Sequence, residues 1–254
     1  MDIVFNNLNL NDETNYWVLN SNHDNVAQQE IDTQKLARTN DSIVLRKNYG
    51  VKTIKMEVVV KDTSRANLDS RLDTFKEYIE VIDKNLDIDY SSGTRRYICS
   101  GAIANIIDRR EKWAKLGLNF SCYKAFGEDT SNTTETFLNK TTTPYTDDIS
   151  IGGTAPAQPD IEITIDSVTA SGDKYMQLKN TDNGDYCKVT DDSWAADDVL
   201  VISNREKKIT LNTVVVEYLG IMPEWLPGTN NWEYSDDFTA RQVDIEFNYA
   251  KRYL

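Results

Sequence analysis

The segment KTIKMEVVVKDTSRANLDSRLDTFKEYIEVIDK, residues 52–84, changes its hydrophobic period partway along and thereby decides the fold class. In residues 52–60 apolar side chains alternate with polar ones, which predicts a half-buried strand; the inward positions are Ile54, Met56, Val58 and Val60. From residue 68 the apolar side chains recur every three or four positions, which predicts an amphipathic helix; this stripe is Leu68, Leu72, Phe75, Ile79 and Ile82. Asp62, Thr63 and Ser64 each offer an oxygen that can cap the helix N-terminus.

The helix is predicted to lie between strands. Residues 86–90 alternate again, and the two runs 96–107 and 113–123 read as the arms of a long antiparallel hairpin around the charged connection 108–112. Inward positions of the second arm are Ala114, Leu116, Leu118, Phe120 and Cys122. Strands, one helix and further strands predict an α+β unit in the N-terminal half.

Residues 127–159 are rich in Thr, Asn, Asp, Gly and Pro, which favours a linker or short edge elements. We place a domain boundary within 124–150 and divide the chain into 1–130 and 131–254. The second half carries short alternating runs at about ten-residue spacing, typical of a sandwich or jelly roll. Asn183-Gly184 predicts a hairpin turn, and Pro227-Gly228 predicts a turn that feeds the last strand. The expected strands are 160–166, 173–180, 185–191, 197–204, 207–212, 213–220 and 241–254.

The bulk composition limits the function. The chain of 254 residues has a net charge of −13 and a pI of about 4.6, so it lacks the basic excess needed to bind nucleic acid by counterion release. We expect no signal peptide and no membrane span, hence a soluble protein that matures in a reducing compartment. The cysteines Cys99, Cys122 and Cys187 are far apart and odd in number, so we expect small buried hydrophobes rather than a disulfide framework or a zinc site.

The sequence gives little support for catalysis. His23 is the single histidine of the chain and lies in a polar, loop-like context, which argues against mechanisms that need a buried, oriented imidazole and against histidine-rich metal sites. The Gly-rich phosphate-binding motifs G-x-x-x-x-G-K-[ST] and G-x-G-x-x-G are both absent from the sequence. Close carboxylate pairs such as Asp87/Asp89 and Asp236/Asp237 are expected on solvated loops, which leaves a two-carboxylate glycoside hydrolase as the weakest hypothesis. We therefore predict no enzyme, no cofactor and no metal.

Three tryptophans of the β-rich half admit two interpretations. Trp194, Trp225 and Trp232 could fill the core at strand ends, or they could form an aromatic platform that stacks on saccharide or contacts a partner. The second interpretation corresponds to a carbohydrate-binding module that mediates adhesion to a host surface.

Several segments in chain order resemble the distal tail protein (Dit) family of siphophages. They are NNLNLND (6–12), RKNYGVKTIKMEVVVK (46–61), TRRYICSGAI (94–103), WAKLGLNFSCY (113–123), DDVLVISNREKKITLNT (197–213), WLPGTNNWEY (225–234) and RQVDIEFNYAKRYL (241–254). The resemblance covers essentially the whole chain. Two positions depart from the family pattern, because Asp197 and Thr213 stand where glycine is expected.

The resemblance implies a mainly β fold with one amphipathic helix, in which an α+β belt domain (1–130) forms a ring and a galectin-like β-sandwich (131–254) projects outward. It implies a homohexameric adaptor at the virion tail tip, assembled in the host cytoplasm. The adaptor would join the tail tube protein to the tail hub and to receptor-binding proteins, and DNA would pass through without specific binding or any membrane contact. We place the possible ring interface on Leu68, Leu72, Phe75, Arg96, Tyr97 and Trp113. The possible saccharide or partner surface is Trp194, Trp225 and Trp232.

Overall fold

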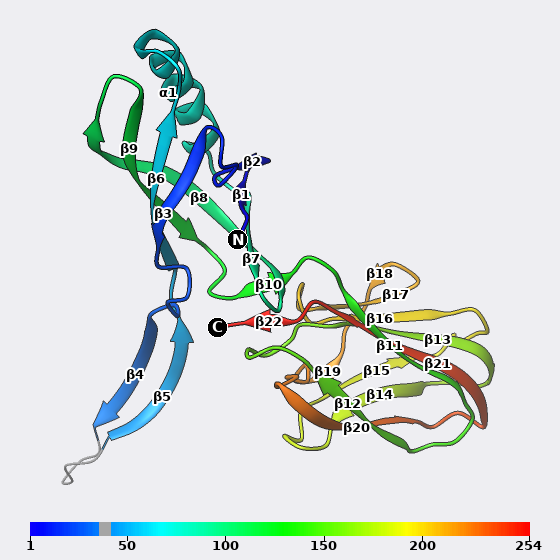
Figure 1. The fold of residues 1–254 in the computed structure, drawn as a ribbon. Coiled ribbons are helices and arrows are strands. Elements are labelled where there is room, and N and C mark those ends of the chain that lie inside the picture. Colours follow the sequence, from blue (N-terminus) through cyan, green and yellow to red (C-terminus); the bar gives the residue numbers. More distant parts are fainter. Residues whose placement is uncertain (36–41) are drawn as a thin grey trace. The chain divides into compact units, whose positions relative to one another are not determined.

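The computed structural model describes residues 1–35 and 42–254 of the chain (Figure 1). Its contacts divide the chain into two compact units. Unit 1 comprises Met1–Thr130 together with Leu254, and unit 2 comprises Ser131–Tyr253. Each unit has its own hydrophobic core, so each is described by itself.

Unit 1 is built on one antiparallel sheet with the strand order β2-β1-β7-β8-β9-β6-β3, and β10 pairs with β8 beside this path. The strands are β1 (Ile3–Phe5), β2 (Leu8–Asn9), β3 (Tyr16–Ser21), β6 (Lys52–Lys61), β7 (Lys84–Tyr90), β8 (Gly93–Arg109), β9 (Trp113–Cys122) and β10 (Gly127–Asp129). A separate two-stranded ribbon consists of β4 (Gln29–Lys35) and β5 (Ser42–Tyr49). The predicted mixture of strands and one helix in this half of the chain is confirmed for the described residues.

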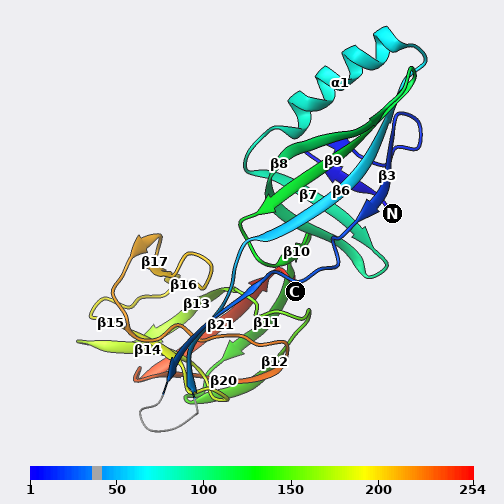
Figure 2. The ribbon, with the colours of Figure 1, turned by 90° about the vertical axis from the view of Figure 1, so that its left-hand side faces the viewer.

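The helix α1 (Arg65–Ile79) begins where the apolar period changes, as predicted. Ser64 caps it, and its Oγ accepts a hydrogen bond from the Asn67 backbone N–H at 3.3 Å. The helix packs on β6 and β8, and Figure 2 shows it running alongside the sheet. The inclusion of Ile82 in the stripe was wrong. The chain leaves the helix at Glu80, whose N–H makes the last bond to the Lys76 carbonyl at 2.8 Å, and Ile82 is 70% exposed.

The long hairpin β8–β9 is confirmed, and the inward residues of β9 predicted from the alternation are all buried. The core of unit 1 lies between these strands and α1. Ring packing across it includes Phe5 against Phe120, with ring centroids 4.8 Å apart, and Tyr16 stacked on Phe75 at 5.3 Å.

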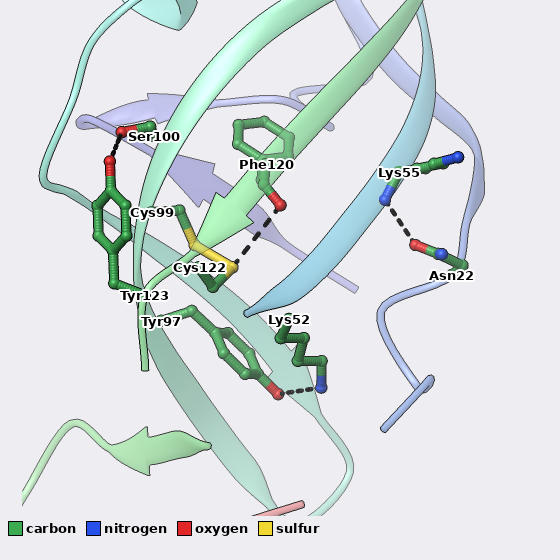
Figure 3. Close-up of a disulfide and its surroundings, with 9 residues drawn as sticks. All are labelled: Asn22, Lys52, Lys55, Tyr97, Cys99, Ser100, Phe120, Cys122 and Tyr123. Atoms are coloured by element: carbon green, nitrogen blue, oxygen red, sulfur yellow. Dashed lines mark hydrogen bonds between the residues drawn. A yellow bond between two sulfur atoms is a disulfide. The ribbon is translucent and has the colours of Figure 1, made fainter. Parts of the chain in front are cut away.

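A disulfide joins Cys99 on β8 to Cys122 on β9 (Figure 3). The expectation that both cysteines act as small buried hydrophobes without a bridge was therefore wrong. The two residues are direct partners in the antiparallel register, with Cα atoms 4.0 Å apart. The predicted hairpin contained the missing signal, because 99 and 122 lie at nearly equal distances from its turn. Cys187 is free and buried, as expected.

Unit 2 consists of two antiparallel sheets that enclose one core, which confirms the sandwich. The first sheet has the order β11 (Thr133–Lys140), β21 (Ala240–Tyr249), β13 (Asp160–Thr169), β16 (Val199–Ser203), β17 (Lys208–Leu211) and β18 (Val214–Val215). The second has the order β12 (Tyr145–Ile151), β20 (Gly228–Asp236), β14 (Lys174–Asn180), β15 (Tyr186–Asp191) and β19 (Leu219–Gly220). The short strand β22 (Arg252–Tyr253) follows, and Arg252 bridges to Gly153 and Ala155.

The alternation of the last long strand is confirmed, because its inward side chains Val243, Ile245, Phe247 and Tyr249 are all buried. Residues 127–159 form edge elements rather than a linker. Their strands β11 and β12 each lie at one end of a sheet. The Asn183-Gly184 turn is also confirmed, since Gly184 has φ of 82° between β14 and β15.

Two expectations in unit 2 were wrong. Pro227-Gly228 does not feed the last strand, because Gly228 opens β20, which lies between β12 and β14. Residues 213–220 do not form one strand either. Val214–Val215 pair with β17 in the first sheet, whereas Leu219–Gly220 pair with β15 in the second, so the chain crosses from one sheet to the other between them.

The two departures from the family pattern keep a backbone conformation that glycine favours. Asp197 has φ of 69° and Thr213 has φ of 72°. Asn212, with φ of 49°, precedes Thr213 in the two-residue turn between β17 and β18. A left-handed pair at this place is the geometry of a tight hairpin turn.

Candidate assembly surfaces

Four of the six residues predicted for a ring interface point into unit 1. Leu68, Leu72 and Phe75 form the buried face of α1, and Tyr97 on β8 is 1% exposed. These side chains hold α1 on the sheet, and in this structure they offer almost no surface to a second molecule.

Arg96 and Trp113, the other two, reach the surface. Arg96 makes a two-point ion pair with Asp87 on β7, with nitrogen–oxygen distances of 2.8 and 2.7 Å. The hydrogen bonds to the Asp87 carboxylate raise the pKa of Arg96 above its ordinary value. Trp113 is the first residue of β9 and lines an open hollow.

This hollow, which we call the tryptophan hollow, has a volume of about 410 Å³. Its lining residues are Trp17, Leu19, Val59, Lys61, Trp113 and Lys115. The inward residues of β6 contribute to the core beneath α1, and side chains alternate along a strand. The hollow therefore lies on the opposite face of the sheet from α1.

Two lysines frame the tryptophan hollow. The Lys61 ammonium lies 5.5 Å from the centre of the Trp17 ring, and Lys115 Nζ lies 2.8 Å from Glu57 Oε2. The strand register explains the grouping, because Val59 pairs with both Trp17 and Lys115, and Lys61 pairs with Trp113. Sequence reasoning missed Trp17 and Leu19. The alternation of inward Tyr16 with outward Trp17 in YWVLN was the available signal.

The sheet of unit 1 holds a buried amine, that of Lys52, at the start of β6 beside the disulfide. Lys52 is 2% exposed, and its Nζ donates to the Tyr97 hydroxyl at 3.3 Å, while the ammonium lies 4.7 Å from the ring centre (Figure 3). Lys52 is also the register partner of Cys122. The arrangement shields the amine inside unit 1.

Trp194, Trp225 and Trp232 are core residues of unit 2. Trp194 is 6% exposed, donates from Nε1 to the Lys174 carbonyl at 2.9 Å, and packs on Phe238. Trp225 and Trp232 are fully buried and both pack against Phe247, with ring centroids 5.0 and 5.3 Å from it. In this structure the three rings offer almost no face for stacking on a sugar.

A run of exposed apolar side chains lies where the chain crosses between the sheets of unit 2. We call it the aliphatic edge, formed by Val214, Val215, Leu219, Ile221 and Leu226. Val214, Val215, Leu219 and Ile221 are each 64–70% exposed. The edge includes β18 and β19, each the terminal strand of its sheet, so backbone hydrogen-bonding groups lie beside the apolar side chains.

The histidine is less exposed than its polar context suggested. His23 is 9% exposed, its Nδ1 lies 2.9 Å from Ser21 Oγ, and its ring packs edge-on against Tyr90. Asp24 lies 3.6 Å from Nε2 and its side chain is 78% exposed. Solvent therefore weakens this pair, and the geometry does not resemble a nucleophile triad, in which a buried acid orients the base.

Residues 1–35 and 42–254 contain neither a metal-binding cluster nor a membrane-spanning helix. No group of three or more His, Cys, Asp or Glu side chains is arranged to hold a metal ion. No helix in this part of the chain has the length and apolar character to cross a bilayer.

The comparisons with known proteins agree in direction. Residues 152–253 match the family described as "Siphovirus-type tail component, C-terminal domain". The whole chain matches the crystal structure of the SPP1 Dit (gp 19.1) protein, described as a paradigm of hub adsorption apparatus in phages that infect Gram-positive bacteria. That match has a TM-score of 0.68 at 16% identity and covers 100% of this chain and 99% of the other.

Two weaker matches are chains from the phage p2 baseplate in its activated conformation, with calcium and with strontium. Their TM-scores are 0.46 and 0.44 at 9% identity, over 97% of this chain and 97% and 96% of the others. A search of curated protein sequences finds no match. Residues 152–253 thus match the siphovirus-type tail component family, and the whole chain shares the fold of SPP1 Dit.

Proposed function

We propose that the protein is a ring-forming adaptor of the siphophage tail tip. Six copies would form the ring, joining the tail tube to the tail hub and to receptor-binding proteins and leaving a channel for DNA. The observation that carries the proposal is the match in fold with SPP1 Dit along the full length of both chains. In this assignment unit 1 is the belt that forms the ring, and unit 2 is the galectin-like domain on its outside.

The distribution of charge supports a channel that does not retain DNA. Residues 1–130 contain 20 acidic and 18 basic residues, whereas residues 131–254 contain 21 acidic and 10 basic residues. Unit 1 is thus nearly neutral and unit 2 strongly acidic. Neither has the cationic excess that binding to phosphates by counterion release requires.

The ring contact predicted from the sequence combines buried and exposed residues. Because Leu68, Leu72, Phe75 and Tyr97 are buried, we propose that they support the interface from beneath, and that Arg96 and Trp113 contact the neighbouring copy. The carbohydrate-binding alternative needed an exposed aromatic surface, but its three residues Trp194, Trp225 and Trp232 lie in the core. We therefore do not propose it as a second function.

The oligomeric state tests the proposal. Light scattering coupled to size exclusion should give the mass of six 29.0 kDa chains, for the protein alone or after co-expression with the tube and hub proteins of the same phage. Negative-stain images should show six-fold rings with a central opening. A protein that stays monomeric and never co-purifies with other tail proteins would refute the adaptor.

A further inference from the structure

The tryptophan hollow and the aliphatic edge are two exposed apolar surfaces on different units, and they carry opposite charges. The hollow has Lys61 and Lys115 at its rim, and Lys61 makes the larger contribution to its positive charge because Lys115 is paired with Glu57. The aliphatic edge has Glu217 and Glu224, both exposed. We propose that the aliphatic edge of one copy docks into the tryptophan hollow of a second copy.

The segment that carries the aliphatic edge holds acidic residues and no cationic ones, which is the first argument. The sequence contains no Lys or Arg between Lys208 and Arg241, while five acidic residues fall in that interval. On the neighbouring strand β15, Lys188 is the register partner of Leu219. Its ammonium lies 3.7 Å from the centre of the Tyr175 ring, which holds it beside β14.

The concentration of apolar surface is the second argument. Seventeen large hydrophobic side chains are exposed in the described part of the chain, and six of them fall within residues 214–226. Scattered exposed apolar residues are normal, but this concentration within thirteen residues, together with the acidic residues of the same segment, is what we expect of a surface that associates. The hollow supplies a matching receptor, because the two tryptophans and Val59 form an apolar floor.

Charge selects this pairing over the alternatives. Two hollows facing each other would place Lys61 and Lys115 of one molecule against the same lysines of the other. Two facing aliphatic edges would likewise place Glu217 and Glu224 against the same glutamates of the second molecule. Only hollow against edge places lysines opposite glutamates around a buried apolar centre, and opposite potentials favour one partner and orientation. Such a contact joins two different surfaces, so each copy can bind one neighbour on each side, as a closed ring requires.

This inference rests on the proposed function only in that a ring uses the contact. Its test is cross-linking between copies with a short bis-maleimide. Leu19→Cys and Leu219→Cys proteins are mixed, and the rate of heterodimer formation is measured. Leu138→Cys, an apolar residue of unit 2 with 54% exposure against 64% for Leu219, replaces Leu219→Cys as the matched control. Where the protein alone is monomeric, the measurement uses the co-purified tail assembly.

We expect the Leu19–Leu219 pair to link about tenfold faster than the Leu19–Leu138 pair, which corresponds to about 1.4 kcal/mol of preferential contact. Lys61→Glu or Glu217→Lys alone should lower the rate, and the two changes on facing copies should restore it. Equal rates for the two pairs, or no restoration by the reversed charges, would overturn the proposal. A chain carrying both Leu19→Cys and Leu219→Cys that links within itself at high dilution would also overturn it.

The outcomes separate the two proposals. Six-fold rings without the preferential cross-link refute this contact and leave the adaptor function standing. A preferential cross-link without rings supports the contact and refutes the closed hexamer.

Discussion

Cys99 and Cys122 are direct partners across β8 and β9, and their sulfur atoms are bonded inside the core of unit 1. The bond closes a loop over a sequence separation of 23 residues and fixes the register of the hairpin that also carries Trp113. The stability and chemistry of unit 1 should therefore respond to reduction.

The first prediction concerns this bond. Unreduced protein in denaturant should show one free thiol, and reduced protein should show three. Replacing both cysteines with serine should destabilise unit 1 by roughly 3 kcal/mol, the loop-closure value for a loop of this size. Alkylation with intact mass measurement and thermal unfolding check both statements. Three thiols in freshly purified, unreduced protein would contradict them.

Cys187 provides an internal control for the thiol count. Burial raises the pKa of this thiol to about 12, so little reactive thiolate forms at pH 8 in folded protein. The thiol should resist alkylation in the native state and react once the protein is unfolded. Rapid native labelling at Cys187 would show that the interior of unit 2 opens under those conditions.

The second prediction concerns Thr213. Its φ of 72° causes steric strain in a β-branched residue, whereas glycine adopts this conformation without strain. Thr213→Gly should stabilise unit 2 by about 0.5–1 kcal/mol, because relief of strain exceeds the extra freedom of the unfolded chain. Thr210→Gly, within β17, is the control and should destabilise it. Chemical denaturation of both variants measures the change in the free energy of unfolding. A loss of stability in Thr213→Gly would contradict the presence of strain at Thr213.

The third prediction concerns Trp232. The side chain is fully buried against Phe137, Tyr145 and Phe247. Trp232→Ala should cost about 3–5 kcal/mol by opening a cavity in the sandwich. Leu226→Ala, at a side chain 48% exposed, should cost much less. Thermal unfolding compares them. A Trp232→Ala protein with unchanged stability would mean that the ring is not part of the core.

The fourth prediction is a dependence on acid. Asp182 accepts hydrogen bonds from Asn231 Nδ2 at 2.8 Å and from the Asn231 backbone N–H at 2.7 Å, and these bonds lower the pKa of Asp182 below its ordinary value. A lowered carboxyl pKa contributes stability that is complete above the unfolded-state value and is lost as pH falls through the folded-state value. Unfolding midpoints of wild type and Asp182→Asn should therefore converge below pH 4. A gap that stays constant down to pH 2 would rule this out.

The sequence predicted the parts of the fold in which one face of a regular element is buried. The stripe on α1 from Leu68 to Ile79 and the alternation of β9 and β21 follow from that condition and are confirmed. The end of α1 at Glu80 was not predictable from periodicity, because Ile82 continues the apolar spacing after the backbone has left the helix.

The errors in unit 2 have a shared cause. VVVEYLG reads as one strand by composition, but composition carries no information on which sheet supplies the partner, and here β18 and β19 find partners in different sheets. No strand was predicted for residues 228–236, because Pro227-Gly228 was read as a turn that feeds the last strand, although the alternation of exposed Asn231 with buried Trp232 fits the strand β20. The tryptophan hollow could not be found either, since it assembles residues from β3, β6 and β9.

The crossover between β18 and β19 has an evolutionary consequence. Each flanking strand is two residues long and ends its sheet, and Glu217 and Tyr218 between them are exposed, so extra residues at this point would leave the strands that carry the core in place. Doubling the length of such a loop costs only about 0.6 kcal/mol. The fold of the sandwich can therefore accept insertions of very different size at this position, and each would reshape the aliphatic edge, so a lineage could change the contacts made there while the rest of the domain stays unchanged.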